Sequence, residues 1–222
     1  MIDWDNIDTV MQDMDGTLLD LHFDNFFWQE NLPRQYARKH QISEEQSSAH
    51  LQDQTRENQG TLDWYCLDHW SRRLDMDIPA LKRELRHMIR LRPHVLEFLT
   101  RLHQSHRDVV MVTNAHPVTL EIKMEQVDIT RWFDRVVVSH DLASPKEERG
   151  FWEKLQSLHP FNPKRTLLID DTERILDSAR DYGIVHLNTL LQPDSQRQKR
   201  LDTRFPGIHH FDEIMPAGTG TS

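Results

Sequence analysis

Short apolar runs alternate with helix-like stretches from residue 93 to residue 187, and this alternation limits the folds open to the chain. Runs typical of strands lie at 108–113, 135–138, 165–169 and 184–187, and the helix-like stretches lie at 93–105, 117–127, 147–158 and 172–182. Continuous apolar strands separated by helices are typical of a parallel sheet covered on both faces. The run 7–12 adds a strand of the same kind. The sequence therefore predicts an α/β fold, a Rossmann-like parallel sheet with helices on both faces.

Residues 23–90 have a different pattern, with helix-like stretches and no convincing strand. Four of these stretches are preceded by residues suited to capping a helix N-terminus, namely Asp24, Ser43, Thr61 and Asp77. Ser43 also begins a capping box, and Pro33 is expected to break the first stretch into two. The pattern predicts an all-helical insertion (23–90) within an α/β core made of 1–22 and 91–222.

The composition is that of a water-soluble chain. Of the 222 residues 28% are charged, the mean hydropathy is −0.71, and no apolar run approaches the ~20 residues of a membrane helix. The net charge of −9 disfavours a surface that holds a nucleic acid polymer. The absence of a signal-peptide pattern and a single cysteine, Cys66, expected to be a buried structural thiol, fit a reducing cytoplasm. The polar end, 217–222, is expected to be frayed.

Polar side chains follow the predicted strands at their carboxyl ends. They are Asp13 and Asp15 after the first strand, Thr113 and Asn114 after the second, Lys146 after the third, and Asp170 and Asp171 after the fourth. In an open parallel sheet, ligands bind outside the carboxyl ends of the strands. We therefore expect these side chains to converge on one crevice.

Clustered carboxylates repel one another unless a cation lies between them, and Mg²⁺ suits a few carboxylates together with waters and phosphate oxygens. Lys146 and the Thr113 hydroxyl can then hold phosphoryl oxygens, with the backbone N–H groups after Asp13 and Asn114 completing the cradle. Of Asp13 and Asp15, one attacks phosphorus to form an aspartyl-phosphate and the other serves as acid and base. These residues predict a Mg²⁺-dependent phosphatase for a small phosphomonoester.

The same motifs resemble those of the haloacid dehalogenase-like (HAD) superfamily and occur in its order. The segment 13–20 is similar to the first motif, 112–114 to the second, Lys146 to the third and 168–172 to the fourth. The helical insertion then stands in the place of the family's cap domain.

This resemblance implies a role for each residue. Asp13 is the nucleophile and a metal ligand, and Asp15 is the acid/base and binds the metal through its carbonyl. Thr113 and Lys146 bind phosphate, and we count Asn114 with them as a substrate-binding residue. Mg²⁺ is held by Asp171, with Asp170 acting through water.

Three stretches, 20–28, 62–68 and 113–117, further resemble the bacterial GMP/IMP nucleotidases. That resemblance implies hydrolysis of purine nucleoside 5′-monophosphates to nucleoside and phosphate. The alternatives are a phosphatase for phosphoglycolate or a sugar phosphate, a phosphomutase with the same intermediate, and an inactive HAD-fold binding protein.

Two groups of side chains leave two interpretations open. The aromatic residues Trp28, Trp64, Tyr65 and Trp70 either stack on a purine or form the core of the insertion, with the core favoured for Trp64 and Trp70. His116 either contacts the substrate or caps the helix that follows it.

Overall fold

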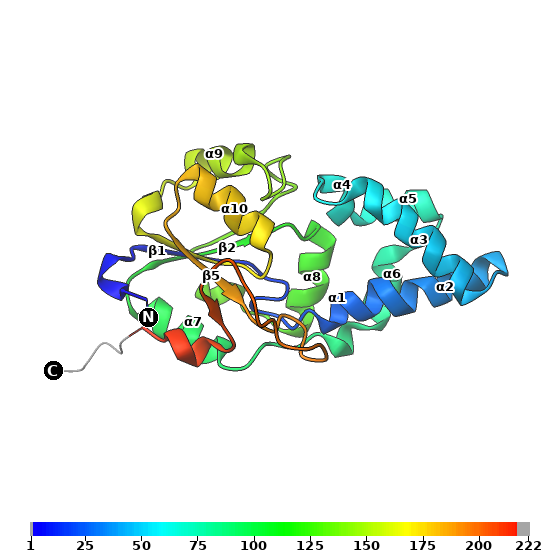
Figure 1. Cartoon of the computed structure of the whole chain (residues 1–222), viewed down its shortest axis with the longest axis horizontal. Helices are drawn as coiled ribbons and strands as arrows, with labels where there is room; N and C mark the ends of the chain where they lie inside the picture. The colour runs from blue at the N-terminus through cyan, green and yellow to red at the C-terminus, as the bar shows by residue number, and fades with distance from the viewer. Residues whose placement is uncertain (1, 217–222) are drawn as a thin grey trace.

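The computed structural model describes residues 2–216, and its centre is one parallel sheet of six strands in the order β3-β2-β1-β4-β5-β6 (Figure 1). The strands are β1 (Thr9–Gln12), β2 (Asp108–Thr113), β3 (Arg135–Val138), β4 (Thr166–Ile169), β5 (His186–Leu190) and β6 (Gly207–Ile208). All of the strand pairs are parallel. This order is that of a Rossmann-like sheet, and the predicted fold class is confirmed.

Helices cover both faces of the sheet because successive strand residues point to opposite sides. In β1, Val10 packs with one hydrophobic cluster, which includes residues of α7 (Val95–Gln104) and α8 (Pro117–Gln126). Its neighbour Met11 packs with the other cluster, which includes residues of α9 (Arg149–Leu158) and α10 (Glu173–Tyr182). Apolar residues on both faces explain why these strands are continuous apolar runs in the sequence.

The register of the central strands sets the position of the polar residues that follow them. Gln12 of β1 lies opposite Ile169 of β4, and the backbone N–H of Asp13 donates to the carbonyl of Ile169 at 3.0 Å. Asp13 is therefore next to Asp170. The strand order reverses between β1 and β4, and a crevice for ligands forms at such a point.

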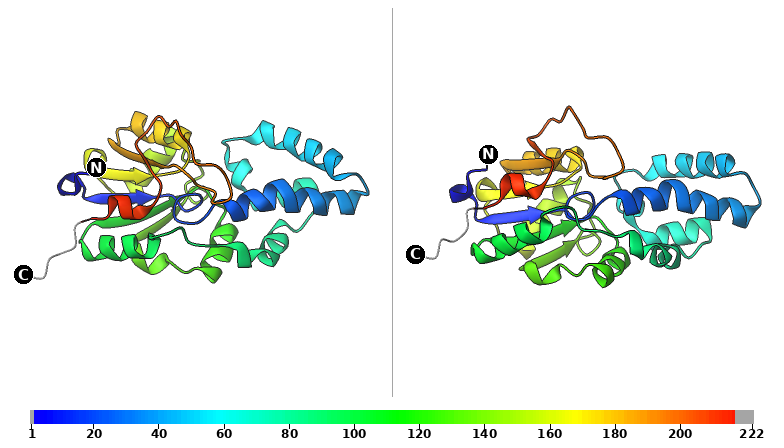
Figure 2. Two further views of the ribbon diagram at one scale, coloured as in Figure 1. Left: turned by 60° about the horizontal axis from the view of Figure 1, so that its bottom comes forward. Right: turned by 90° about the horizontal axis from the view of Figure 1, so that it is seen from below.

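Every named element between β1 and α7 is a helix or a helical turn, and two isolated β-bridges, Asp15–Leu19 and Leu19–Leu91, lie on either side of the insertion. Figure 2 shows these helices beyond the end of the sheet to which the arrow of β1 points. They are α1 (His22–Phe26), a π-helical turn (Phe27–Asn31), α2 (Leu32–His40), α3 (Glu44–Asn58), α4 (Leu62–Tyr65), α5 (Leu67–Leu74), α6 (Ile78–Glu84) and a 3₁₀ turn (Arg86–Met88). We keep the division into a core (1–22 and 91–222) and a cap (23–90) as a proposal.

Most of the predicted helix caps in this insertion are confirmed. The side chains of Ser43, Thr61 and Asp77 each accept a backbone N–H of the first turn, and Ser43 makes a complete capping box. The prediction for Asp24 was wrong, because it lies inside α1 and its carboxylate binds two lysines instead.

Pro33 does not break the first helix as predicted. Backbone dihedrals stay helical from α1 through the π-helical turn into α2, and the N–H of Leu32 donates to the carbonyl of Phe27. Proline is tolerated near the start of a helical segment, and the wider turn before it absorbs the change in hydrogen bonding.

The chain after β4 departs from the sequence expectations. The last predicted strand, 184–187, is shifted to His186–Leu190, since Gly183 has a φ of +124° and the strand starts only after the turn it makes. Residues beyond it add β6 and a 3₁₀ turn (Phe211–Ile214), whose side chains Phe211 and Ile214 are buried. The predicted frayed end, 217–222, lies outside the described residues. In the described part of the chain no helix is long and apolar enough to cross a membrane.

Gln12 is a buried polar residue in the central strand. Its side chain is fully buried, and neither the amide nitrogen nor the amide oxygen has a hydrogen-bond partner among residues 2–216. We expect Gln12→Met to raise the free energy of unfolding by about 1–2 kcal/mol, because the desolvated amide is replaced by an apolar chain of similar size. Thermal denaturation measures this as a rise in Tm of about 2–4 °C per kcal/mol.

The matched control is Gln126→Met at an exposed position of α8, which should change stability by less than about 0.5 kcal/mol. An unchanged or lower Tm in Gln12→Met would show that the Gln12 amide is satisfied in solution.

Candidate active site

The centre of the site is a buried ammonium group between two carboxylates. Nζ of Lys146 lies 2.5 Å from Oδ1 of Asp13 and 2.7 Å from Oδ2 of Asp170. It also donates to the carbonyl of Val112 at 3.1 Å. Asp13, Asp170 and Lys146 are all buried, so one cation links the carboxylates that follow β1 and β4.

The loop that carries Lys146 is held by Asn114. Its Oδ1 accepts the backbone N–H of Lys146 at 2.9 Å, and its Nδ2 donates to Glu147 at 2.8 Å. The indole N–H of Trp152 donates to the carbonyl of Lys146 at 3.1 Å. Asn114 therefore positions Lys146, and its assignment to substrate binding stays a prediction.

Asp171 completes a group of three acids with Asp13 and Asp170. Their carboxylate oxygens lie within 4.8 Å of one another, and all three residues are buried. Gly16 makes room for this approach, because a Cβ there would lie 2.7 Å from Cγ of Asp171 and the backbone has a φ of +77°. Only glycine combines that backbone conformation with that contact. Gly16 is thus required because Asp171, which follows the neighbouring strand β4, lies so close to it.

Burial disfavours the charged forms of these three acids. It raises the pKa of Asp13 to about 8, with Asp170 and Asp15 adding to the rise and Lys146 opposing it. Burial and a neighbouring acid raise the pKa of Asp170 to about 6 and that of Asp171 to about 7. Burial lowers the pKa of Lys146, but Asp13 and Asp170 outweigh it and the net pKa is raised, so the ammonium stays charged. Lys146, together with the partly exposed guanidinium of Arg200 at 3.9 Å from Oδ2 of Asp171, does not neutralise three carboxylates.

The donor set fits a hard divalent cation. Mg²⁺ binds through a small number of carboxylates and keeps open positions for water and phosphate oxygens. Asp13, Asp170 and Asp171 supply the carboxylates of such a site. Of the four predicted metal ligands, the structure brings these three together, and the binding of Mg²⁺ itself stays a proposal.

The carboxylate of Asp15 faces a different partner. Oδ1 of Asp15 lies 2.5 Å from Nζ of Lys123, a buried lysine of α8. Burial raises the pKa of Asp15, with Lys123 opposing that rise. The Asp15 side chain is therefore separate from the three-acid group, and its predicted contact with metal through the carbonyl stays a prediction.

Lys123 belongs to a chain of charges, its lysines buried and its acids partly buried, that reaches the helical insertion. Its ammonium lies 2.6 Å from Oδ2 of Asp24, and Oδ1 of Asp24 lies 2.7 Å from Nζ of Lys82 in α6. Burial raises the pKa of Asp24, but Lys123 and Lys82 outweigh it and hold the pKa well below its usual range. The Lys82 ammonium also lies 4.9 Å from the ring centroids of Phe23 and Phe27. The order Asp15–Lys123–Asp24–Lys82 links the core to the insertion through alternating charges.

Sequence reasoning missed Lys82 and Lys123. Lys82 lies one helical turn after the buried Ile78, whereas Lys123 lies one turn after the buried Thr119. A lysine on an apolar face was the available signal for Lys82, since a lysine is rarely buried unless it is paired. The partner could not be read from the sequence because Asp24 is far from both lysines along the chain.

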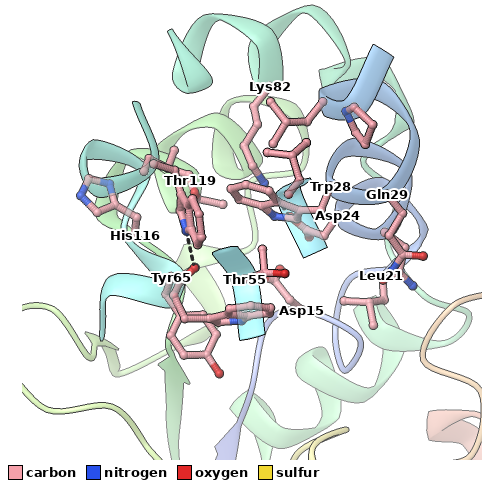
Figure 3. A pocket seen from close by; sticks show the side chains of 18 of the residues that line it. Asp15, Leu21, Asp24, Trp28, Gln29, Thr55, Tyr65, Lys82, His116 and Thr119 are labelled. Atoms are coloured by element: carbon pink, nitrogen blue, oxygen red, sulfur yellow. Dashed lines mark hydrogen bonds and ion pairs between the residues drawn. The ribbon is translucent and has the colours of Figure 1, made fainter. Parts of the chain in front are cut away.

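A cavity of about 700 Å³ lies between the insertion and the strand-end loops. Figure 3 shows Asp15, Trp28, Tyr65 and His116 around this space. Trp28, Trp64, Tyr65 and Trp70 all line it, although Trp70 is also almost completely buried in the core of the insertion. Trp70 therefore both lines the cavity and packs in the core of the insertion. Trp28 and Trp64 are half-buried and pack against that core as well. Tyr65 is half-buried too.

Thr113, the last residue of β2, and His116, which follows the strand, make local contacts. The hydroxyl of Thr113 is buried and accepts the backbone N–H of Ala115 at 3.0 Å. Nδ1 of His116 accepts the backbone N–H of Val118 at 3.4 Å, so His116 caps α8, and it also lines the cavity. The predicted roles of Thr113 and Lys146 in binding phosphate are left as proposals.

The chain belongs to the haloacid dehalogenase-like hydrolases. The model of this family matches residues 10–188, which include every strand-end residue described above. The resemblance noted in the sequence motifs is thus confirmed, and the protein is a hydrolase of this family.

The chain is similar to a named relative in sequence and to solved structures in fold. It is 36% identical to the GMP/IMP nucleotidase YrfG of Escherichia coli (strain K12) over 216 residues, which is 97% of each chain. Among solved structures, the HAD phosphatase from Thermococcus onnurineus matches with a TM-score of 0.77 at 16% identity, covering 94% of this chain and 96% of that chain. YfnB from Bacillus subtilis, solved bound to magnesium, matches with a TM-score of 0.62 at 20% identity over 94% of this chain and 96% of that one.

The raised pKa values of Asp13, Asp170 and Asp171 make stability depend on pH and Mg²⁺ together. A carboxyl with a raised folded pKa stabilises the fold fully below its unfolded pKa, and that stability is lost as pH rises through the folded value. Without metal, this group therefore destabilises the fold as pH rises from 6 to 8. Mg²⁺ binds the deprotonated form, so its apparent affinity should rise by about tenfold or more over that interval.

We expect the increase in Tm on adding Mg²⁺ to be larger at pH 8 than at pH 6, measured against EDTA by thermal denaturation. In Asp171→Asn the increase should shrink at both pH values. An equal increase at both pH values in the unsubstituted chain would contradict a three-carboxylate metal site.

Proposed function

We propose that this hydrolase is a Mg²⁺-dependent phosphatase that converts purine nucleoside 5′-monophosphates, GMP and IMP above all, to nucleoside and phosphate. The observation that carries the proposal is the buried group of Asp13, Asp170 and Asp171 with Lys146 inserted between the first two. Such a site attracts a phosphate dianion only when a cation is added. Mg²⁺, when bound, neutralises charge on the carboxylates and on the phosphoryl oxygens.

Asp13 acts as the nucleophile in this proposal. One carboxylate oxygen of Asp13 attacks phosphorus, and the bond from phosphorus to the ester oxygen of the nucleotide breaks. The contact of Lys146 with Oδ1 fixes the orientation of the Asp13 carboxylate and keeps a positive charge beside the phosphoryl group. The product of this step is an aspartyl-phosphate at Asp13.

Asp15 moves the protons. It gives a proton to the departing ester oxygen, and it takes one from the water that then attacks the phosphorus of the aspartyl-phosphate. The second attack breaks the bond between phosphorus and the Asp13 oxygen and releases inorganic phosphate. The raised pKa of Asp15 favours the protonated form needed for the first step, and Lys123 holds its carboxyl group in place.

The cavity supports a nucleoside as the group attached to the phosphate. Aromatic faces of Trp28 and Trp64 can pack against a purine, and Gln29 and Gln52 add amide donors and acceptors to the same wall. A cavity of about 700 Å³ lies within the range used for drug-sized ligands. The relative in Escherichia coli is named a GMP/IMP nucleotidase, which favours purine nucleotides over other phosphomonoesters. A cytoplasmic location is part of this proposal.

A substrate panel tests the proposal. With Mg²⁺, kcat/KM for GMP and IMP should exceed that for ribose 5-phosphate and phosphoglycolate by at least about tenfold, which corresponds to about 1.4 kcal/mol of contact with the base. The measurement is release of inorganic phosphate. Equal or faster hydrolysis of the small phosphates would reject the nucleotidase assignment and leave the phosphatase one in place.

Asp13→Asn provides the test of chemistry. It should fold with an unchanged circular dichroism spectrum and lose phosphate release almost completely, because the amide cannot form the aspartyl-phosphate. Unchanged activity in this variant would show that Asp13 is not the nucleophile. Conversion of a sugar phosphate to its isomer without phosphate release would instead indicate a phosphomutase.

A further inference from the structure

A second group of potential metal ligands lies apart from the three acids, at the contact between the insertion and the core. Ligand atoms of Cys66, His116 and His140 lie within 4.8 Å of one another. Cys66 connects α4 to α5 in the insertion, His116 caps α8, and His140 lies in the turn after β3. Cys66 is half-buried rather than buried as expected from the sequence, and its Sγ accepts the backbone N–H of His69 at 3.4 Å. Segments far apart in the sequence thus meet at three side chains that bind metals well.

The unsatisfied ring nitrogens of His140 favour a bound ligand at this position. Both of its ring nitrogens are buried from solvent, and neither has a hydrogen-bond partner among residues 2–216. A buried polar group without a partner costs free energy, and nearly all such groups in proteins are satisfied. The ring lies edge-on to that of His116, with 5.0 Å between centroids. A metal ion bound by both rings would satisfy one nitrogen of His140.

His116 and Asp68 supply two further candidate ligand atoms. Nδ1 of His116 is used in capping α8, which leaves Nε2 as the ligand atom. Oδ2 of Asp68, from α5, lies 3.8 Å from that Nε2. Burial lowers the pKa of both His116 and His140, which keeps the two imidazoles neutral and able to coordinate near pH 7. Three potential ligand atoms therefore face one point, one from the insertion and two from the core, and the exposed carboxylate of Asp68 lies beside His116 at its edge.

We propose that Cys66, His116 and His140, with Asp68 as the fourth ligand, form a site for a borderline divalent cation such as Zn²⁺, and that the bound ion fastens the insertion to the core. Thiolate, imidazole and carboxylate are the ligands of tetrahedral zinc sites, whereas Mg²⁺ prefers oxygen alone. Neighbouring ligand atoms around tetrahedral zinc are about 3.5 Å apart, so small side-chain shifts close the site.

An ion at this position would connect the insertion to the core. The insertion and the core already meet nearby through the hydrogen bond of Tyr65 to Glu147 at 2.7 Å. Because the cavity is lined from both sides, an ion that joins α5 to the start of α8 holds one wall of the cavity against the other. The site shares no residue with the acidic group of Asp13, Asp170 and Asp171.

Titration with Co²⁺ in excess Mg²⁺ and under a non-thiol reductant tests the site. Cys66 is the only cysteine in the sequence, so a thiolate-to-cobalt charge-transfer band in the near ultraviolet can come only from this residue. We expect one equivalent of Co²⁺ to produce that band together with the intense visible absorption of tetrahedral Co²⁺. Zn²⁺ should abolish both by displacement. The absence of the band in the unsubstituted chain would overturn the proposal.

Variants assign the ligands. Cys66→Ser should remove the charge-transfer band, and His140→Gln should weaken Co²⁺ binding by at least about tenfold. Asp13→Asn and His103→Gln, the latter an exposed histidine of α7, should leave both spectra unchanged. Cys66→Ser and His140→Gln change separate segments, so misfolding of one leaves the other as a test. A band of full strength at the same affinity in His140→Gln would show binding by Cys66 alone and contradict the site.

Hydrogen exchange tests the fastening without using activity. Adding Zn²⁺ should slow amide exchange in Leu67–Leu74 and at the start of α8 in the unsubstituted chain and not in Cys66→Ser. Equal slowing in both proteins would mean that Zn²⁺ acts elsewhere. Because neither readout needs substrate, failure of the metal site and failure of the nucleotidase proposal are distinguishable.

Discussion

The contact on which the site depends is the buried ion pair of Lys146 with Asp13 and Asp170. Breaking such a pair leaves an uncompensated buried charge, which costs several kcal/mol. The surrounding residues serve to place this one ammonium group: Asn114 holds its backbone, Val112 accepts from its Nζ, and Trp152 binds its carbonyl. Yet one lysine balances only part of the charge of three carboxylates. The same burial that fixes the carboxylate of Asp13, the proposed nucleophile, thus leaves negative charge that the proposed divalent cation would balance.

A second set of partly buried charges connects the core to the helical insertion. Asp15 is two residues from Asp13, and its carboxylate is connected through Lys123 and Asp24 to Lys82 in the insertion. Helix α6, whose Lys82 lines the cavity, is thereby connected electrostatically to the proposed acid/base. The position of α6 therefore bears on the charges around the carboxylate of Asp15, the proposed acid/base. The metal site proposed at Cys66, His116 and His140 would add a further, independent contact across the same boundary.

The parts of the fold that follow local rules could be predicted from the sequence. Strands 108–113 and 135–138 match the structure to the residue, because apolar side chains on both faces leave one clear pattern. The residues at the strand ends could be predicted as a group because parallel strands deliver them to one edge. What could not be predicted depends on distant partners. Asp24 looked like a helix cap because its lysines come from α6 and α8, and β6 is too short to show a period. The π-helical turn before Pro33 likewise reflects how two helical segments join, which a breaker rule does not contain.

The stereochemical course at phosphorus tests the central claim most directly, because the claim is that phosphorus passes through a bond to a protein carboxylate. The measurement is hydrolysis, in H₂¹⁷O with Mg²⁺, of a guanosine 5′-phosphorothioate made chiral with ¹⁶O and ¹⁸O, followed by configurational assignment of the thiophosphate. Two successive displacements, at Asp13 and then at water, lead us to expect retention of configuration. Inversion would mean a single attack by water and would contradict the account, whatever the substrate preference of the enzyme.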